Sequence, residues 1–410
     1  MTESPDVIPQ PSRVRNVDEA IMRFGRARVS DYIDFLSVGD PLADAFAEDC
    51  VSIGKGKAMT MLNSWLDGVP IGDIEDAPQS LHDLVEQLGT VPDFVDFTQI
   101  DQGAAAFSRH AREAGLALST TSLVSGYDNP AASKPLIVTG RFSEMAPVRA
   151  IETSMWVFTV GRPGGLHQFS EGFKRTVRVR MIHAFVRRHI LTNVEWDTHA
   201  DGIPINQADL AYTVVEFMWL PVRSMQMMGV YYTDDDLAAI YSMWRYMAYL
   251  MGVDTRIAPV NGTECQELED LHMALGQPPN DDCRLLTHAL LTDVLAVDVK
   301  QASGIIGIVG RRYGRQFVHG LTRAFVGERI ADNLHIDNTA WRHVPRLISP
   351  AVYTASRIRY LVPGANERQM VRNLQEIDDL VAANAKARGI THDLVDASSG
   401  VSSVTSHPAA

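Results

Sequence analysis

The stretch VRVRMIHAFVRRHI, residues 177–190, contains no glycine, proline or other turn signal. In its first part, together with Thr176, polar and apolar residues alternate (TVRVRM), so a short β-strand is the local alternative to a helix. The second part, HAFVRRHI, continues without interruption and favours a helix. Ser170 is a suitable N-cap residue, because its side chain can accept a hydrogen bond from the first helical turn. The sequence therefore predicts one helix from Ser170 to about Thr192.

Helical spacing of apolar residues also extends to most of the chain on both sides of this stretch. Further helices are expected at residues 17–36, 149–160, 207–220, 233–251, 282–302, 313–327 and 366–388. Strand-like alternation is scarce, and no long linker divides the middle of the chain. We therefore expect an all-α fold, with one large helical domain at residues 17–396 and loose tails at residues 1–16 and 397–410.

The central histidine of the opening stretch shares one helical face with two arginines. On a helix, residues three and four positions apart are neighbours, which places Arg180 and Arg187 beside His183. Between Lys174 and Arg188 there are six Lys or Arg residues and no acidic residue. Surface helices usually interleave both signs, because like charges at this spacing repel. The helix is therefore expected to face negatively charged groups.

Three kinds of partner fit this basic face. The arginines can pair with carboxylates elsewhere in the chain, with His183 as a hydrogen-bonded core histidine. They can bind a phosphate or nucleic acid. They can also neutralise haem propionates while the imidazole ligates the iron. The residues alone leave all three interpretations open, with the first as the most common case.

The overall composition restricts the classes of protein. The chain has 410 residues, a net charge of -13 and a pI of about 5.4, which argues against a general nucleic-acid-binding protein. Its three cysteines, Cys50, Cys265 and Cys283, are too few for a disulfide framework and fit a reducing compartment. No secretory signal or membrane-spanning apolar run is recognised, so we expect a cytoplasmic protein without a transmembrane segment.

Other candidate sites give weaker signals. Glu269 and His272 form an E-x-x-H pair, but a di-iron centre needs a second pair, so a solvated acidic helix face is the expected structure. His189 and His199 lack zinc-type spacing with cysteine. The methionine- and aromatic-rich residues 217–251 are expected in the core, with part of them as the lining of an apolar substrate cavity.

Seven short strings, taken in order, resemble the oxygenase family of the rubber oxygenases and the fungal MpaB-type oxygenases. They are GDPLADA (39–45), TGRF (139–142), RAIET (149–153), VRMIHAFVRRHI (179–190), GIPINQADL (202–210), WRYMAYLMGVD (244–254) and LTRAFVGERIADNL (321–334). The resemblance covers roughly residues 20–340. Each string is modest alone, and their common order is what makes the resemblance specific.

The resemblance implies an all-α fold with a globin-like core that binds haem b non-covalently. It implies that His183 is the proximal iron ligand, and that Arg149 and Thr153, on one helical face, line the haem site. Arg180 and Arg187 become candidate partners of the haem propionates or of buried carboxylates. The implied reaction uses O₂ and a small apolar substrate, for which an unsaturated compound is the candidate, with an electron donor left open as a further partner.

The chain also departs from the family pattern. Where rubber oxygenases can have an iron-approaching lysine before the threonine, this chain has Glu152, so a lysine-ligated state is not expected. Glu152 is a candidate catalytic base if it faces the distal side, whereas Glu144 cannot be aligned with the base proposed in the rubber enzymes. The alternatives to an oxygenase are a non-catalytic haem sensor or storage protein of the same fold, and a scaffold without haem.

Overall fold

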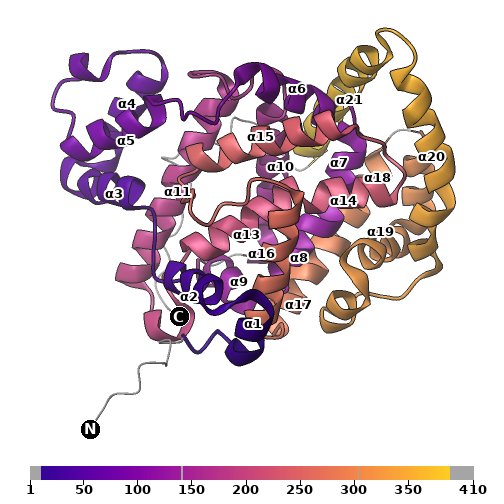
Figure 1. The fold of residues 1–410 in the computed structure, drawn as a ribbon, viewed down its shortest axis with the longest axis horizontal. Coiled ribbons are helices and arrows are strands. Elements are labelled where there is room, and N and C mark those ends of the chain that lie inside the picture. Colours follow the sequence, from indigo (N-terminus) through magenta and orange to yellow (C-terminus); the bar gives the residue numbers. More distant parts are fainter. Residues whose placement is uncertain (1–10, 140–141, 303, 388–410) are drawn as a thin grey trace.

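The computed structural model describes residues 11–139, 142–302 and 304–387, and every regular element within these ranges is a helix. The all-α prediction is therefore confirmed for the described residues. Figure 1 shows the helices arranged in several layers, with α3, α4 and α5 at one side and α19, α20 and α21 at the other. The alternative of a strand at TVRVRM is wrong, because the whole segment lies inside a helix. The globin-like arrangement stays a prediction.

The helices before the central hairpin are α1 (Val17–Phe24), α2 (Arg26–Phe35), α3 (Pro41–Ile53), α4 (Lys55–Leu66), α5 (Gln79–Gly89), α6 (Phe97–Ser108), α7 (Ala111–Ala117), α8 (Leu123–Tyr127) and α9 (Pro130–Val138). The hairpin is α10 (Phe142–Val160) and α11 (Glu171–Asn193). The remaining helices are α12 (Thr198–Asp201), α13 (Gln207–Met218), α14 (Leu220–Met227), α15 (Asp234–Leu250), α16 (Gly262–Leu275), α17 (Asp281–His288), α18 (Ala296–Gln301), α19 (Gly304–Asn333), α20 (Val344–Tyr360) and α21 (Ala365–Ala387). Short 3₁₀ turns lie at Ile71–Asp73 and Ala340–His343.

Helix starts with a polar cap agree best with the sequence prediction. The Ser170 side chain accepts a hydrogen bond from Phe173 N at the start of α11, and Asn206 accepts one from Asp209 N at the start of α13. Two interruptions of the expected helices were not predicted, because no proline marks them in the sequence. The expected helix 17–36 is two helices separated at Gly25, whose φ of 85° lies in the region that favours glycine. The expected helix 282–302 contains a π-helical segment at Ala289–Leu295.

The core is built around α13, most of whose side chains are buried. α6 and α15 pack especially closely, since a Cβ on Gly103 would lie 2.1 Å from the carbonyl oxygen of Ala239. Residues 11–16, expected in a loose tail, are held in place: Arg13 is buried and forms two hydrogen bonds with Asp209, 2.6 and 2.9 Å long. Residues 1–10 and 397–410 lie outside the described residues. Within the part described, none of the helices combines the length and apolar character needed to cross a membrane.

Candidate functional site

The α10–α11 hairpin positions most of the residues expected at the site. Near its closed end, Trp156 Nε1 donates a hydrogen bond to Thr176 Oγ1, 3.0 Å away. Arg149 lies seven positions before Trp156, and His183 lies seven positions after Thr176. At ~1.5 Å of rise per residue, Arg149 and His183 each lie about 10 Å from this bond, on the side away from the connecting loop. The hairpin thus brings the two residues to the same level of the fold.

His183 is a neutral imidazole in a largely enclosed environment. Burial, with a contribution from the positive charge of Arg187, lowers its pKa to about 4. Its Nδ1 is buried and has no hydrogen-bond partner among the described residues, which is uncommon for a buried polar atom. The side chain nevertheless keeps some accessible surface. A neutral imidazole nitrogen without a hydrogen-bond partner can ligate a metal.

Arg149 is also incompletely satisfied. Its Nη1 atom is buried without a hydrogen-bond partner in the described structure. Burial lowers the pKa of Arg149, while the nearby Tyr127 and Glu152 act in the opposite direction. Burial likewise raises the pKa of Glu152, and the positive charge of Arg149 opposes that rise. Arg149 and Glu152 are therefore partly desolvated groups of opposite charge, one helical turn apart on α10.

Thr153 contributes to a small cavity of about 30 Å³, which has room for about one water molecule. The other lining residues are mostly apolar or small and come from α7, α8, α10, α13 and the π-helical segment Leu118–Ser122: Gly115, Leu118, Ser119, Leu123, Ala150, Ser154, Val157, Phe158 and Phe217. Phe217 belongs to the methionine- and aromatic-rich stretch, so one residue of that stretch does line a cavity. Thr153 thus faces a mainly apolar space.

The two arginines beside His183 have protein partners. Arg180 forms a bidentate pair with Asp40, 2.6 and 2.9 Å long, and donates to Gln87 Oε1 at 2.6 Å. Arg187 pairs with Asp44 and donates to the carbonyl oxygens of residues 204 and 205, at 3.0 and 2.7 Å. Of the three kinds of partner expected from the sequence, the carboxylates are the ones that the structure shows. A contact with haem propionates stays a prediction.

A buried carboxyl group, which the sequence reasoning missed, lies in the same region. Glu216 on α13 is 8% exposed, and its carboxyl packs on Gly126, where a Cβ would lie 2.6 Å from Glu216 Oε1. Burial and the negative charge of Asp209 raise the pKa of Glu216 well above its ordinary value. Tyr127 is within electrostatic range of both Glu216 and Arg149. The one available signal was a single carboxylate in the otherwise uncharged run AYTVVEFMW.

Replacing Glu216 with Gln should change how stability depends on pH. Folding raises the pKa of Glu216, so above about pH 4.5 the folded chain keeps a proton that the unfolded chain has lost. The free energy of unfolding of the wild type therefore falls as pH rises above this value. The contribution is at most about 1.4 kcal/mol per pH unit. Urea unfolding between about pH 5 and pH 8 should show Glu216→Gln becoming more stable relative to wild type with rising pH. An equal trend in the exposed Glu195→Gln control would contradict the assignment.

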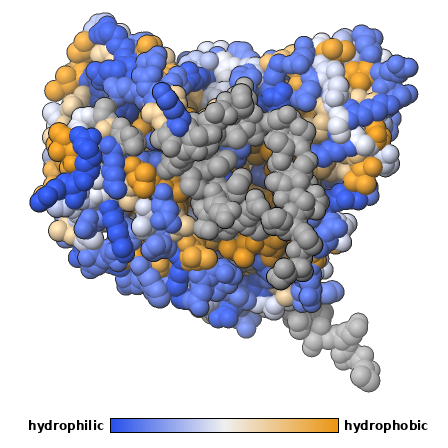
Figure 2. Space-filling model, turned by 180° about the vertical axis from the view of Figure 1, so that it is seen from behind, coloured by the Kyte–Doolittle hydropathy of each residue, from blue (hydrophilic) through white to orange (hydrophobic). Residues whose placement is uncertain are grey.

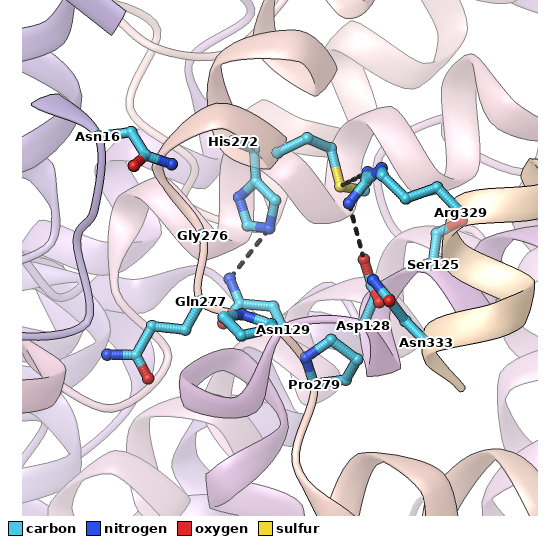
Figure 3. Close-up of a pocket in the computed structure, with 12 residues that line it drawn as sticks. Asn16, Ser125, Asp128, Asn129, His272, Gly276, Gln277, Pro279, Arg329 and Asn333 are labelled. Carbon is cyan, nitrogen blue, oxygen red and sulfur yellow. Dashed lines mark hydrogen bonds and ion pairs between the residues drawn. The ribbon is translucent and has the colours of Figure 1, made fainter. Parts of the chain in front are cut away.

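A second, polar pocket of about 210 Å³ lies beside α16 (Figure 3). Its His272 is held between Tyr32 OH (2.7 Å from Nδ1) and Asn129 Nδ2 (3.0 Å from Nε2), and its ring stacks on Tyr212 at 3.7 Å. Asp128 lies at the other side, 3.9 Å from Arg329. Burial raises the pKa of Asp128 to about 7. The pocket therefore presents a carboxyl group that titrates near neutral pH.

The prediction that the E-x-x-H pair lies on a solvated acidic helix face is wrong, because Glu269 and His272 are both buried. Glu269 accepts hydrogen bonds from Arg223 Nη1, the shorter 2.8 Å long, and from Trp219 Nε1 at 3.2 Å. These neighbours satisfy the carboxylate without a metal ion. Among the described residues, no cluster of three or more His, Cys, Asp and Glu side chains has a geometry suited to a metal.

The fold places the chain in a known structural class. It is similar to the solved structure of latex clearing protein in the closed state, with a TM-score of 0.62 over 85% of this chain and 91% of that chain, at 19% sequence identity. An all-α protein with the latex-clearing-protein fold is thus the class that the helices define. The family model described as "ER-bound oxygenase mpaB/B'/Rubber oxygenase, catalytic domain" matches residues 109–358, and the chain belongs to this family.

A curated relative supports the same assignment. The rubber oxygenase of Streptomyces sp. (strain K30) is 24% identical to the chain over 238 residues. The aligned region spans 57% of this chain and 58% of that protein, so somewhat more than half of the relative's length is matched. The family resemblance that the ordered strings indicated is therefore confirmed. The residues that the family model matches, 109–358, include the α10–α11 hairpin, α13 and most of α20.

Proposed function

We propose that the chain is a haem b-dependent oxygenase that uses O₂ to oxidise a small, apolar substrate, with His183 as the proximal iron ligand. One observation carries the proposal: His183 is neutral, and its buried Nδ1 has no hydrogen-bond partner among the described residues, in a family whose members are named as oxygenases. The unpaired Nη1 of Arg149, at the same level of the hairpin, fits a polar group of a cofactor. These residues are thus suited to haem.

Each residue of the site has a distinct task in this proposal. His183 would hold the iron, and haem supplies the capacity to bind and activate O₂ when present. Its low pKa keeps the imidazole unprotonated at neutral pH, which ligation requires. Thr153 would provide a hydroxyl group beside a small, mainly apolar space, and Arg149 would provide a positive charge one helical turn away on the same face of α10.

Two carboxyl groups are available for proton transfer. Burial raises the pKa values of both Glu152 and Glu216, so that each can hold a proton nearer to neutral pH than an exposed glutamate can. Glu152 is the closer to Arg149 and Thr153 in sequence, and we propose it as the catalytic base. Glu216, which is within electrostatic range of Tyr127, would then be a second group that holds a proton near the site.

An absorbance titration of the purified chain with haemin tests the proposal. We expect saturable uptake of one haem per chain, seen as a Soret band that differs from that of free haemin. A chain that stays colourless after reconstitution would rule out the haem assignment. If haem binds but the reduced protein consumes no O₂ with unsaturated apolar substrates, the non-catalytic sensor or storage function is favoured instead.

A further inference from the structure

α20 and the residues that follow it expose large apolar side chains. Leu347 and Leu361 are 76% and 81% exposed, and Ile358 is 54% exposed. Leu347, Ile358 and Leu361 lie on one helical face with the small residues Ala351 and Thr354 between them, because these positions follow the alternating three- and four-residue spacing. Single exposed apolar residues are common on protein surfaces, but an aligned set indicates an interaction surface. We call Leu347, Ile358 and Leu361 the outer face of α20.

The charge around the outer face is opposite to that of the whole chain. Residues 304–372 contain eleven arginines and four carboxylates, whereas the chain has a net charge of -13. Four of these arginines are paired with carboxylates: Arg315, Arg323, Arg329 and Arg342. No Asp or Glu occurs between Asp337 and Glu367, a segment that includes all of α20. Within the described ranges, Arg346 and Arg357 have no carboxylate partner. Arg357 lies over the ring of Tyr231 and donates a hydrogen bond to Tyr353 OH, 3.2 Å away. This is a local cationic surface on an acidic protein.

The position of α20 makes this surface accessible. In Figure 1, α20 lies at the edge of the molecule, with α21 and α19 next to it. On the same side in Figure 2, which is the left of that view, hydrophobic and hydrophilic surface alternate. The outer face lies on a projecting helix, a shape suited to shallow insertion into a broad surface.

We propose that the outer face of α20 docks on the surface of a membrane that contains anionic lipids. Interfacial helices combine a row of apolar side chains, which enter the acyl boundary, with arginines that bind lipid phosphates, and they lack acidic residues. α20 has all three features. The docking is peripheral, and it does not depend on haem. If the substrate is apolar, docking would also bring the site to the phase in which such a substrate dissolves.

Co-sedimentation of the full chain with vesicles tests the proposal. We expect binding to vesicles of phosphatidylcholine with phosphatidylglycerol, much weaker binding to phosphatidylcholine alone, and loss of binding in high salt. Arg346→Gln with Arg357→Gln should weaken binding about 30-fold. Leu347→Glu with Leu361→Glu should reduce it to background. Met22→Glu, at an 81% exposed apolar residue on α1, and Arg15→Gln are the matched controls and should bind as wild type does.

The outcomes separate the membrane from other partners. Absence of binding to both kinds of vesicle overturns the proposal, as does binding that the α20 variants leave unchanged. Gel filtration of the same proteins tests whether the outer face binds a second copy of this chain instead of a membrane. A wild-type dimer that Leu347→Glu with Leu361→Glu converts to a monomer, without vesicle binding by either form, would show that the outer face is a subunit interface. Circular dichroism of each variant verifies that the helical fold is retained.

Discussion

The His183→Ala variant is expected to bind haem about 100-fold more weakly than wild type, or not at all. Changes to groups that only orient a metal ligand cost ~10–100-fold in affinity, so loss of the ligand itself should cost at least as much. The alanine removes an imidazole that makes no hydrogen bond within the described structure, so the fold should survive the change. Haemin titration followed by absorbance measures the affinity, and circular dichroism checks the helical content.

His189→Ala is the matched control for this experiment. His189 lies six residues further along α11 and contacts Asn193 at the exposed end of the helix. The His189→Ala substitution should leave the haem affinity unchanged. Added imidazole should restore the Soret band of a His183→Gly variant, because a free ligand can occupy the vacated space. Equal haem affinity in wild type and His183→Ala would assign the iron ligand to another residue.

The sequence predicted local features of the site better than its contacts. The helical period and the Ser170 cap were enough to define α11, and His183 could be placed on one face with Arg180 and Arg187. The partners of these arginines could not be predicted, because Asp40 and Asp44 are about 140 residues away in sequence and reach α11 only through packing of α3. Long-range pairing depends on the whole fold, which local periodicity does not encode.

Glu216 shows a second limit. In the sequence it is one carboxylate in an otherwise uncharged run, and its pKa is raised only once the fold buries it, against Gly126 and within range of the charge of Asp209. The π-helical segment Leu118–Ser122 has no proline or glycine to mark it, although it lines the cavity next to Thr153. Such segments interrupt the regular α-helical hydrogen bonding and are frequent at functional sites. The residues that complete a site can therefore be invisible to motif reasoning.

Replacing Asp40 with Ala should lower the free energy of unfolding by about 3–5 kcal/mol. Asp40 is 3% exposed and accepts two hydrogen bonds from Arg180, so its loss leaves a buried guanidinium without its counter-charge. Asp40 also caps α3 by accepting from Ala43 N at 3.3 Å, which adds to the effect. Urea unfolding of the purified chain measures the change.

The same two helices supply the control, because Glu48 on α3 pairs with Arg188 on α11 at an exposed position. Glu48→Ala should change stability little, since solvent screens that pair. The double variant Asp40→Ala with Arg180→Met should be more stable than Asp40→Ala alone, because it removes the unpaired charge. If Asp40→Ala unfolds like wild type, the pair does not hold α3 to α11. If it is destabilised as expected and also loses haem affinity, the pair contributes to the site by fixing the helix that carries His183.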